Sequence, residues 1–165
     1  MLHQVSLKQA TEFAFQALKA NLVPFLSASP GCGKSAAVHQ LAKRFNLKVI
    51  DIRLAQEDPT ALGGFPSIVN GRSTYAPPER FPLEGDKIPD GYAGFLIFFD
   101  EINSAPRSVI SAAYKIVLDR MIGEKHLHPN VRMIAAGNLA TDNAIVNEMG
   151  TAMRSRVVHI HVTTH

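Results

Sequence analysis

The loop at residues 28–35 constrains this chain more than any other part of its sequence. It reads Ala-Ser-Pro-Gly-Cys-Gly-Lys-Ser, and it lies between an apolar run at residues 22–26 and a helix-like stretch beginning near Lys34. A strand, a glycine-bearing loop ending in Gly-Lys-Ser, and a helix form the pattern that cradles nucleotide phosphates. Gly31 and Gly33 let the backbone curl so that N–H groups point inward, where the helix start adds partial positive charge. The sequence therefore predicts a site for a nucleoside triphosphate.

Individual residues of the loop have separate expected roles. Lys34 can reach the β- and γ-phosphates, and the Ser35 hydroxyl can take part in a Mg²⁺ site. Ala28 stands where the usual pattern has glycine. Cys32 lies among the loop amides, where its thiol pKa could be lowered, but a small residue tolerated in the loop is the favoured interpretation. The residues expected to contact the nucleotide are Ala28, Ser29, Pro30, Gly31, Cys32, Gly33, Lys34, Ser35 and Ala36.

Composition limits the class of protein. The chain has 165 residues, of which 46% are hydrophobic and 19% charged, which predicts one globular domain over residues 1–165. The net charge of +3 comes from scattered basic residues, so a solvated surface is favoured over a nucleic-acid footprint. A single cysteine excludes an internal disulfide. Because no apolar stretch approaches ~18 residues and no signal pattern opens the chain, we expect a cytoplasmic protein without membrane contact.

Helical and strand patterns alternate along the chain. A capping box at Ser6–Gln9 begins a first helix, a second follows the loop, a third follows Pro106, and a short one is expected near 142–153. A β-hairpin is predicted at 67–75 around Asn70-Gly71, and a smaller one at 121–128. Strands alternating with helices predict an α/β fold with a parallel sheet between helix layers. The expected strands are 22–28, 48–54, 94–99, 131–136 and 157–162.

Two acids end the third predicted strand. The run Phe95–Phe99 is continuously apolar, and Asp100 and Glu101 follow it. Ligands bind at the carboxyl edge of open α/β sheets, so both carboxylates are expected there. Asp100 is positioned to hold Mg²⁺ alongside Ser35, directly or through water, and Glu101 is the candidate base that orients and polarises a water. Capping of the next helix is the less favoured alternative.

Two further positions are candidates for the same chemistry. Asn138 follows the fourth predicted strand, and its amide could contact the γ-phosphate or the attacking water; a turn-forming asparagine is the alternative. Arg154 and Arg156 precede the fifth strand, and an arginine there could complete the site of a neighbouring subunit. Arg156 is the preferred candidate and Arg154 the reserve. His159 and His161 alternate on that strand, but without a third ligand nearby a sheet-edge pair is favoured over a metal site.

The order of these elements resembles the AAA+ ATPase superfamily, and within it the MoxR-like group. Residues 28–35 match Walker A, Phe95–Glu101 match Walker B, Asn138 matches sensor 1 and Arg156 the arginine finger. The segments 53–60, 100–106 and 135–138 also resemble the MoxR-like group. The resemblance implies a three-layer αβα P-loop NTPase with strand order 5-1-4-3-2 and a β-hairpin insertion, about residues 63–80, before the second helix of the core.

The resemblance also implies activity and partners. It implies an ATPase that acts on the β–γ anhydride with ATP and Mg²⁺, assembles as a head-to-tail ring, usually a hexamer, and remodels a protein partner, often with a von Willebrand A-type protein. The family normally continues into a helical lid, whereas this chain ends at His165. We therefore expect a core domain without a lid, with turnover that depends on assembly. One alternative is a nucleotide-gated binding or loading module with little intrinsic hydrolysis, acting on a protein partner or on nucleic acid. The other, less favoured, is a small-molecule kinase.

Overall fold

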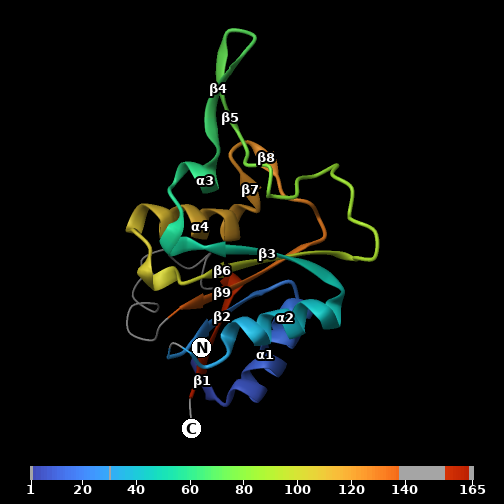
Figure 1. Ribbon diagram of the computed structural model, residues 1–165, viewed down its shortest axis with the longest axis vertical. Coiled ribbons are helices and arrows are strands. Elements are labelled where there is room, and N and C mark those ends of the chain that lie inside the picture. The colour runs from blue at the N-terminus through green and yellow to red at the C-terminus, as the bar shows by residue number, and fades with distance from the viewer. Residues whose placement is uncertain (1, 30, 138–154, 164–165) are drawn as a thin grey trace.

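A six-stranded parallel sheet forms the centre of the molecule (Figure 1). The computed structural model describes residues 2–29, 31–137 and 155–163. The sheet order is β1-β10-β2-β9-β6-β3. Its strands are β1 (Leu2–Val5), β2 (Val23–Ser27), β3 (Leu47–Arg53), β6 (Gly94–Asp100), β9 (Val131–Gly137) and β10 (Val157–Val162). The five predicted strands have the order 5-1-4-3-2, so the predicted fold class is confirmed.

The sixth strand, β1, was not predicted from the sequence. It is only four residues long and half polar, which is too short for an alternating pattern to be recognised. Its position depends on backbone pairing with β10, in the register Leu2 to His159 and Val5 to Val162. The N–H and hydroxyl of Thr163 both donate to the Val5 carbonyl, at 2.8 and 3.2 Å. Because β1 covers β10, the two histidines of β10 are on an interior strand and not at the sheet edge.

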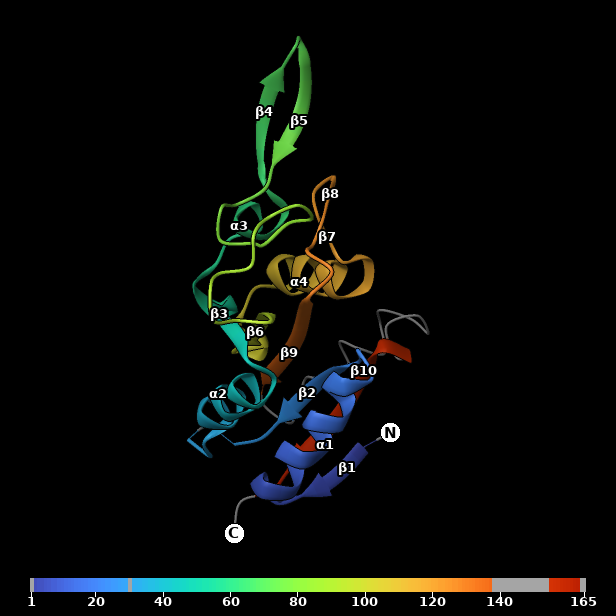
Figure 2. The same cartoon turned by 90° about the vertical axis from the view of Figure 1, so that its right-hand side faces the viewer.

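Helices cover both faces of the sheet, as Figure 2 shows from the side. Helices α1 (Leu7–Lys19) and α2 (Lys34–Phe45) pack on one face, and α4 (Arg107–Asp119) packs on the other. The predicted capping box is present at Ser6, whose hydroxyl accepts from the Gln9 N–H at 3.3 Å. Among the described residues, no helix is long and apolar enough to cross a membrane.

The apolar run in β6 serves both layers. Phe95, Ile97 and Phe99 face the α4 layer, while Leu96 and Phe98 face the α1–α2 layer. Each of these side chains is at most 6% exposed. Strands that are buried on both faces need apolar residues at every position, which is why this segment shows no alternation in the sequence.

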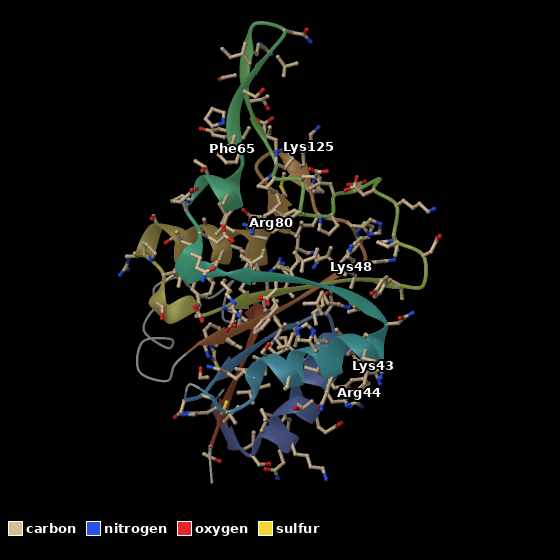
Figure 3. All side chains as sticks on the ribbon, viewed as in Figure 1. Lys43, Arg44, Lys48, Phe65, Arg80 and Lys125 are labelled. Atoms are coloured by element: carbon tan, nitrogen blue, oxygen red, sulfur yellow. The ribbon has the colours of Figure 1, made fainter. Side chains whose placement is uncertain are left out.

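Two hairpins extend from the α4 side of the sheet. Strands β4 (Phe65–Val69) and β5 (Arg72–Ala76) form the predicted insertion, joined by Asn70 and Gly71 at φ 52° and 74°. This two-residue turn has the left-handed geometry that matches strand twist. The hairpin projects from the body, and Figure 3 shows Phe65 at its base. The second predicted hairpin is also present, as β7 (Met121–Ile122) and β8 (Lys125–His126).

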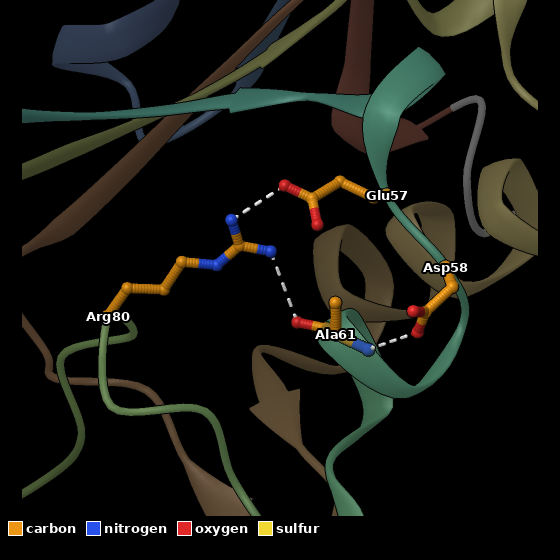
Figure 4. Close-up of polar contacts among 4 residues, drawn as sticks. All are labelled: Glu57, Asp58, Ala61 and Arg80. Carbon is orange, nitrogen blue, oxygen red and sulfur yellow. Dashed lines mark hydrogen bonds and ion pairs between the residues drawn. The ribbon is translucent and has the colours of Figure 1, made fainter.

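The projecting hairpin starts directly after helix α3 (Thr60–Gly63), which follows the 3₁₀ turn η1 (Leu54–Gln56). Residues 77–93, between β5 and β6, run as a loop without a helix. Arg80 ties this loop to the body: its Nη1 lies 2.6 Å from Glu57 Oε1, and its Nη2 donates to the Ala61 carbonyl at 3.2 Å (Figure 4). Asp58 accepts from the Ala61 N–H, capping α3. The predicted helix at 142–153 lies outside the described residues.

Candidate nucleotide-binding site

The phosphate loop connects β2 to α2 at the carboxyl edge of the sheet. Gly31 and Gly33 have φ angles of 80° and 94°, in the left-handed region that side chains rarely adopt. Gly33 is the residue immediately before α2, and a Cβ there would come within 3.2 Å of Leu7 Cδ2. Both conformation and space therefore favour glycine at this position. The first turn of α2 leaves N–H groups without partners inside the helix, and such groups are suited to bind an anion.

The Lys34 ammonium lies where three chain segments meet. Its Nζ donates to the Ala28 carbonyl at 3.3 Å and to the Gly137 carbonyl at 3.1 Å. The Ala28 N–H also donates to the Gly137 carbonyl, at 3.1 Å. The start of the loop, the end of β9 and the lysine are thus joined around one backbone oxygen. An ammonium has three donors, so both carbonyls can be exchanged for phosphate oxygens without leaving the charge in an apolar site.

Asp100 lies across the same edge, at the end of β6. Its side chain is half-buried, and its Oδ1 accepts from the Glu101 N–H at 2.8 Å. Burial is the main cause that raises the pKa of Asp100, and the negative charges of Glu101 and Asp51 raise it further. The positive charge of Lys34 acts in the opposite direction and lowers this pKa.

Glu101 occupies an unusual backbone position. Its φ and ψ are 57° and 40°, in the left-handed region, and its side chain is exposed. The 3₁₀ turn η2 (Ile102–Ser104) follows immediately, so the strand ends in a sharp bend. Strained backbone at an acidic residue beside a phosphate loop is a feature found at functional sites. Asn138 lies outside the described residues, although Gly137 before it is at this edge.

The donors available to Mg²⁺ are few but of the right kind. Ser35 and Asp100 offer a hydroxyl and a carboxylate, and Mg²⁺ prefers oxygen ligands. Within residues 2–29, 31–137 and 155–163 there is no group of three or more His, Cys, Asp or Glu side chains that could hold a metal. A Mg²⁺ ion bound together with a nucleotide takes further ligands from phosphate and water, so two protein oxygens can be enough. The residues therefore fit a nucleotide-bound Mg²⁺.

Arg156 lies at the opposite edge of the sheet. It precedes Val157, which pairs in register with Val23, whereas the phosphate loop follows the far end of β2. Arg156 is therefore level with Leu22, which lies six positions before Ala28. At about 3.3 Å per residue along the strand, this puts roughly 20 Å between Arg156 and the start of the loop. Its side chain is too short to span that distance. Arg154, the reserve candidate, lies outside the described residues.

Two features of the site were not predicted from the sequence. Asp51, on β3, is close enough to affect the Asp100 carboxyl; its position after two half-buried apolar residues gave no sign of this. A groove of about 370 Å³ also lies beside the loop, lined by Leu7 and Lys8 of α1 and by Gly33 and Ala36 among others. Only the packing of α1 against α2 creates it.

Three solved structures share the fold of this chain. The NtrX structure from Brucella abortus matches with a TM-score of 0.59 and 16% identity over 96% of this chain. A candidate ATPase from Cytophaga hutchinsonii matches with a TM-score of 0.57 and 17% identity over 95% of this chain. The RuvB Holliday junction branch migration motor from Thermotoga maritima matches with a TM-score of 0.54 and 16% identity over 96% of this chain.

This chain spans less than half of each of those proteins: 37%, 46% and 45% of their lengths. No curated protein sequence matched it. Among protein families, residues 24–162 match the one described as the ATPase family associated with various cellular activities. That match begins in β2 and ends in β10, so it includes the phosphate loop, the acidic end of β6 and β9. The chain therefore belongs to the AAA family of ATPases.

Proposed function

We propose that this chain binds ATP with Mg²⁺ and hydrolyses it, as a MoxR-like member of the AAA+ superfamily that remodels a protein partner. The observation that supports this most is the convergence of Lys34, the phosphate loop and Asp100 at one edge of the sheet. A lysine ammonium and a half-buried carboxylate beside loop N–H groups suit a complex of metal ion and triphosphate better than they suit a metal ion alone or a triphosphate alone.

The phosphate-binding residues of the proposal are Ala28 to Ala36. Loop N–H groups and the Lys34 ammonium would bind the β- and γ-phosphates, in place of the carbonyls that Lys34 now contacts. Ser35 and Asp100 would hold Mg²⁺, which neutralises phosphate charge when bound. The raised pKa of Asp100 results mainly from burial, so a cation there would favour the ionised carboxylate.

Glu101 is the proposed general base. Its carboxylate would orient a water for in-line attack on the γ-phosphate and accept the proton of that water. Its exposure leaves the side chain accessible to such a water. Asn138 would contact the γ-phosphate or the water from the neighbouring strand end.

Arg156 would act on the site of a neighbouring subunit. The roughly 20 Å between the two sheet edges prevents action within one subunit and suits a head-to-tail ring, which we propose to be a hexamer. We further propose that residues 1–165 act as a single AAA+ core domain in the cytoplasm. A von Willebrand A-type protein is the candidate partner.

Separable mutants test the site. Lys34→Ala should weaken ATP binding by roughly 10- to 100-fold, because it removes charge-assisted hydrogen bonds to phosphate. Lys43→Ala is the matched control, since it removes an exposed lysine from the last turn of the same helix. Glu101→Gln should keep ATP affinity and lower turnover by roughly 10²- to 10⁴-fold. Normal hydrolysis by Glu101→Gln would refute the assignment of the base.

Two further measurements test assembly. Mixing Glu101→Gln with Arg156→Ala subunits should restore part of the activity, since some interfaces then contain one intact site; no recovery in co-assembled mixtures argues against a trans arginine. Phosphate release per subunit should rise steeply with protein concentration. Release that stays absent at all concentrations, with and without DNA, would instead favour a nucleotide-gated loader.

A further inference from the structure

A groove of about 460 Å³ lies at the end of α2 that is farther from the phosphate loop. Because α2 begins at the loop and is 12 residues long, the groove is roughly 18 Å from it. The groove is lined by the last turns of α2, by the first residues of β3 and by Tyr92, which comes from the loop before β6. We call four of its lining residues, His39, Lys43, Lys48 and Tyr92, the basic corner.

The turn between α2 and β3 brings the basic corner together. Asn46 has a φ of 56°, and this left-handed residue takes the chain from the helix into the strand within one position. Lys43 and Lys48 therefore lie on the same side of the molecule, as Figure 3 shows. The Ala93 N–H donates to the Asn46 carbonyl at 2.7 Å, which holds Tyr92 beside this turn. The fold thus gathers residues that are scattered along the sequence.

The basic corner carries positive charge that has no acidic partner. Lys43 and Lys48 are exposed, and neither forms an ion pair within the part of the chain that the structure describes. None of the described residues that line the groove is acidic. The acid of β3, Asp51, lies three positions from Lys48, which is roughly 10 Å, or one Debye length. The C-terminus of α2 contributes only about half a negative charge, which two lysines outweigh, so the groove is suited to an anion.

Tyr92 adds an aromatic face to this charge. Its side chain is 45% exposed, and among the described residues its ring stacks on no other ring. Lysine on an edge strand deters pairing with another strand, and lysine in the last turn of a helix complements the helix dipole. Neither of these roles needs an exposed tyrosine. Cations that bind a phosphate backbone, beside an aromatic ring on which a base can stack, are the combination that binds single-stranded nucleic acids.

We infer that the basic corner binds single-stranded nucleic acid, with Lys43 and Lys48 on its phosphates and Tyr92 stacked on a base. His39 offers ring nitrogens to the same backbone. Every base has a face that can stack, so we expect little dependence on base sequence. In a duplex the bases are stacked on one another, so only the lysines could contact it. This inference does not rest on the proposed function, because the basic corner and the phosphate loop lie at opposite ends of α2.

Fluorescence anisotropy of a labelled oligothymidylate of about 15 nucleotides tests the charge at this site. A plot of log affinity against log salt concentration should have a slope of about −0.7 for each phosphate contact. Lys48→Gln removes one contact, so it should weaken binding by roughly three- to tenfold and make the slope shallower by about 0.7. Lys125→Gln removes the same charge from β8, away from the groove, and should bind as the wild type does (Figure 3).

Two variants of Tyr92 test stacking separately from charge. Tyr92→Ala should weaken binding roughly tenfold with an unchanged salt slope, whereas Tyr92→Phe keeps the ring and should bind as the wild type does. The matching DNA duplex should bind less tightly and should not respond to Tyr92→Ala. The replaced side chains are exposed, so each variant should unfold at the wild-type temperature. Single-strand binding that is unchanged in either Lys48→Gln or Tyr92→Ala would overturn the inference, as would no wild-type binding at about 10⁻⁴ M protein.

Two competing explanations have their own controls. Oligonucleotide at the basic corner should stay bound in excess Mg²⁺-ATP, whereas displacement by ATP would place it on the phosphate loop and overturn the inference. Binding of a fluorescent ATP analogue by the wild-type chain tests the proposed function separately, so either idea can fail while the other holds. Vesicles of phosphatidylserine and phosphatidylcholine test the other anionic partner. Vesicle binding that is weakened by Lys48→Gln, without oligonucleotide binding, would assign the basic corner to a membrane surface and overturn binding of nucleic acid.

Discussion

The left-handed backbone of Glu101 predicts that replacing it with asparagine stabilises the ligand-free protein. A residue with a Cβ loses about 1 kcal/mol or more at φ 57° and ψ 40° compared with the right-handed region. Asparagine tolerates these angles several-fold better, which corresponds to roughly 0.5–1 kcal/mol. Glu101→Gln keeps the strain but removes the charge that opposes Asp100, so the difference between the two variants isolates the backbone contribution.

Both variants should lose hydrolysis, whereas only Glu101→Asn should gain the backbone contribution. For a domain of this size, about 1 kcal/mol shifts the midpoint of thermal unfolding by roughly 2–4 °C. We therefore expect Glu101→Asn to melt roughly 1–4 °C above Glu101→Gln, measured by differential scanning calorimetry without nucleotide. Equal midpoints for the two variants would refute the reasoning that the site stores backbone strain at its candidate base.

Three further outcomes follow from burial and contacts. Asp100→Asn should stabilise the ligand-free chain at neutral pH. Because the pKa of Asp100 is raised in the folded state, its carboxyl contributes to the free energy of unfolding when it is protonated at low pH, and this contribution is lost as pH rises. In unfolding titrations, the stability gained by the variant should therefore vanish below pH ~3.9. Burial lowers the pKa of His159, so the unfolded chain binds a proton at this residue more readily than the folded chain does. The free energy of unfolding should therefore fall as pH drops through ~6.5, and His159→Leu should flatten this dependence in the same titrations. Arg80→Gln should lower the free energy of unfolding, measured by urea denaturation, by about 1 kcal/mol, because it breaks the partly buried ion pair with Glu57. Arg44→Gln should lower it less, because the ion pair of Arg44 with Glu12 is more exposed.

Much of the fold is local enough to predict. The capping box at Ser6, the Asn70-Gly71 turn and the apolar run of β6 each depend on residues a few positions apart, and each has the predicted structure. β1 was missed because four residues do not reveal a period. Its place is decided by pairing with β10, at the other end of the chain.

The sequence by itself determined the phosphate loop and the acidic end of β6, since glycine conformation, helix start and strand burial are properties of short segments. Only the tertiary structure decided what surrounds them. It brought Gly137 to Lys34 across 103 positions, Asp51 to Asp100 across neighbouring strands, and Arg120 to the start of β9. Such contacts follow from sheet order and helix packing, which no local pattern encodes. The same packing places Arg156, just before β10, at the edge of the sheet opposite the phosphate loop.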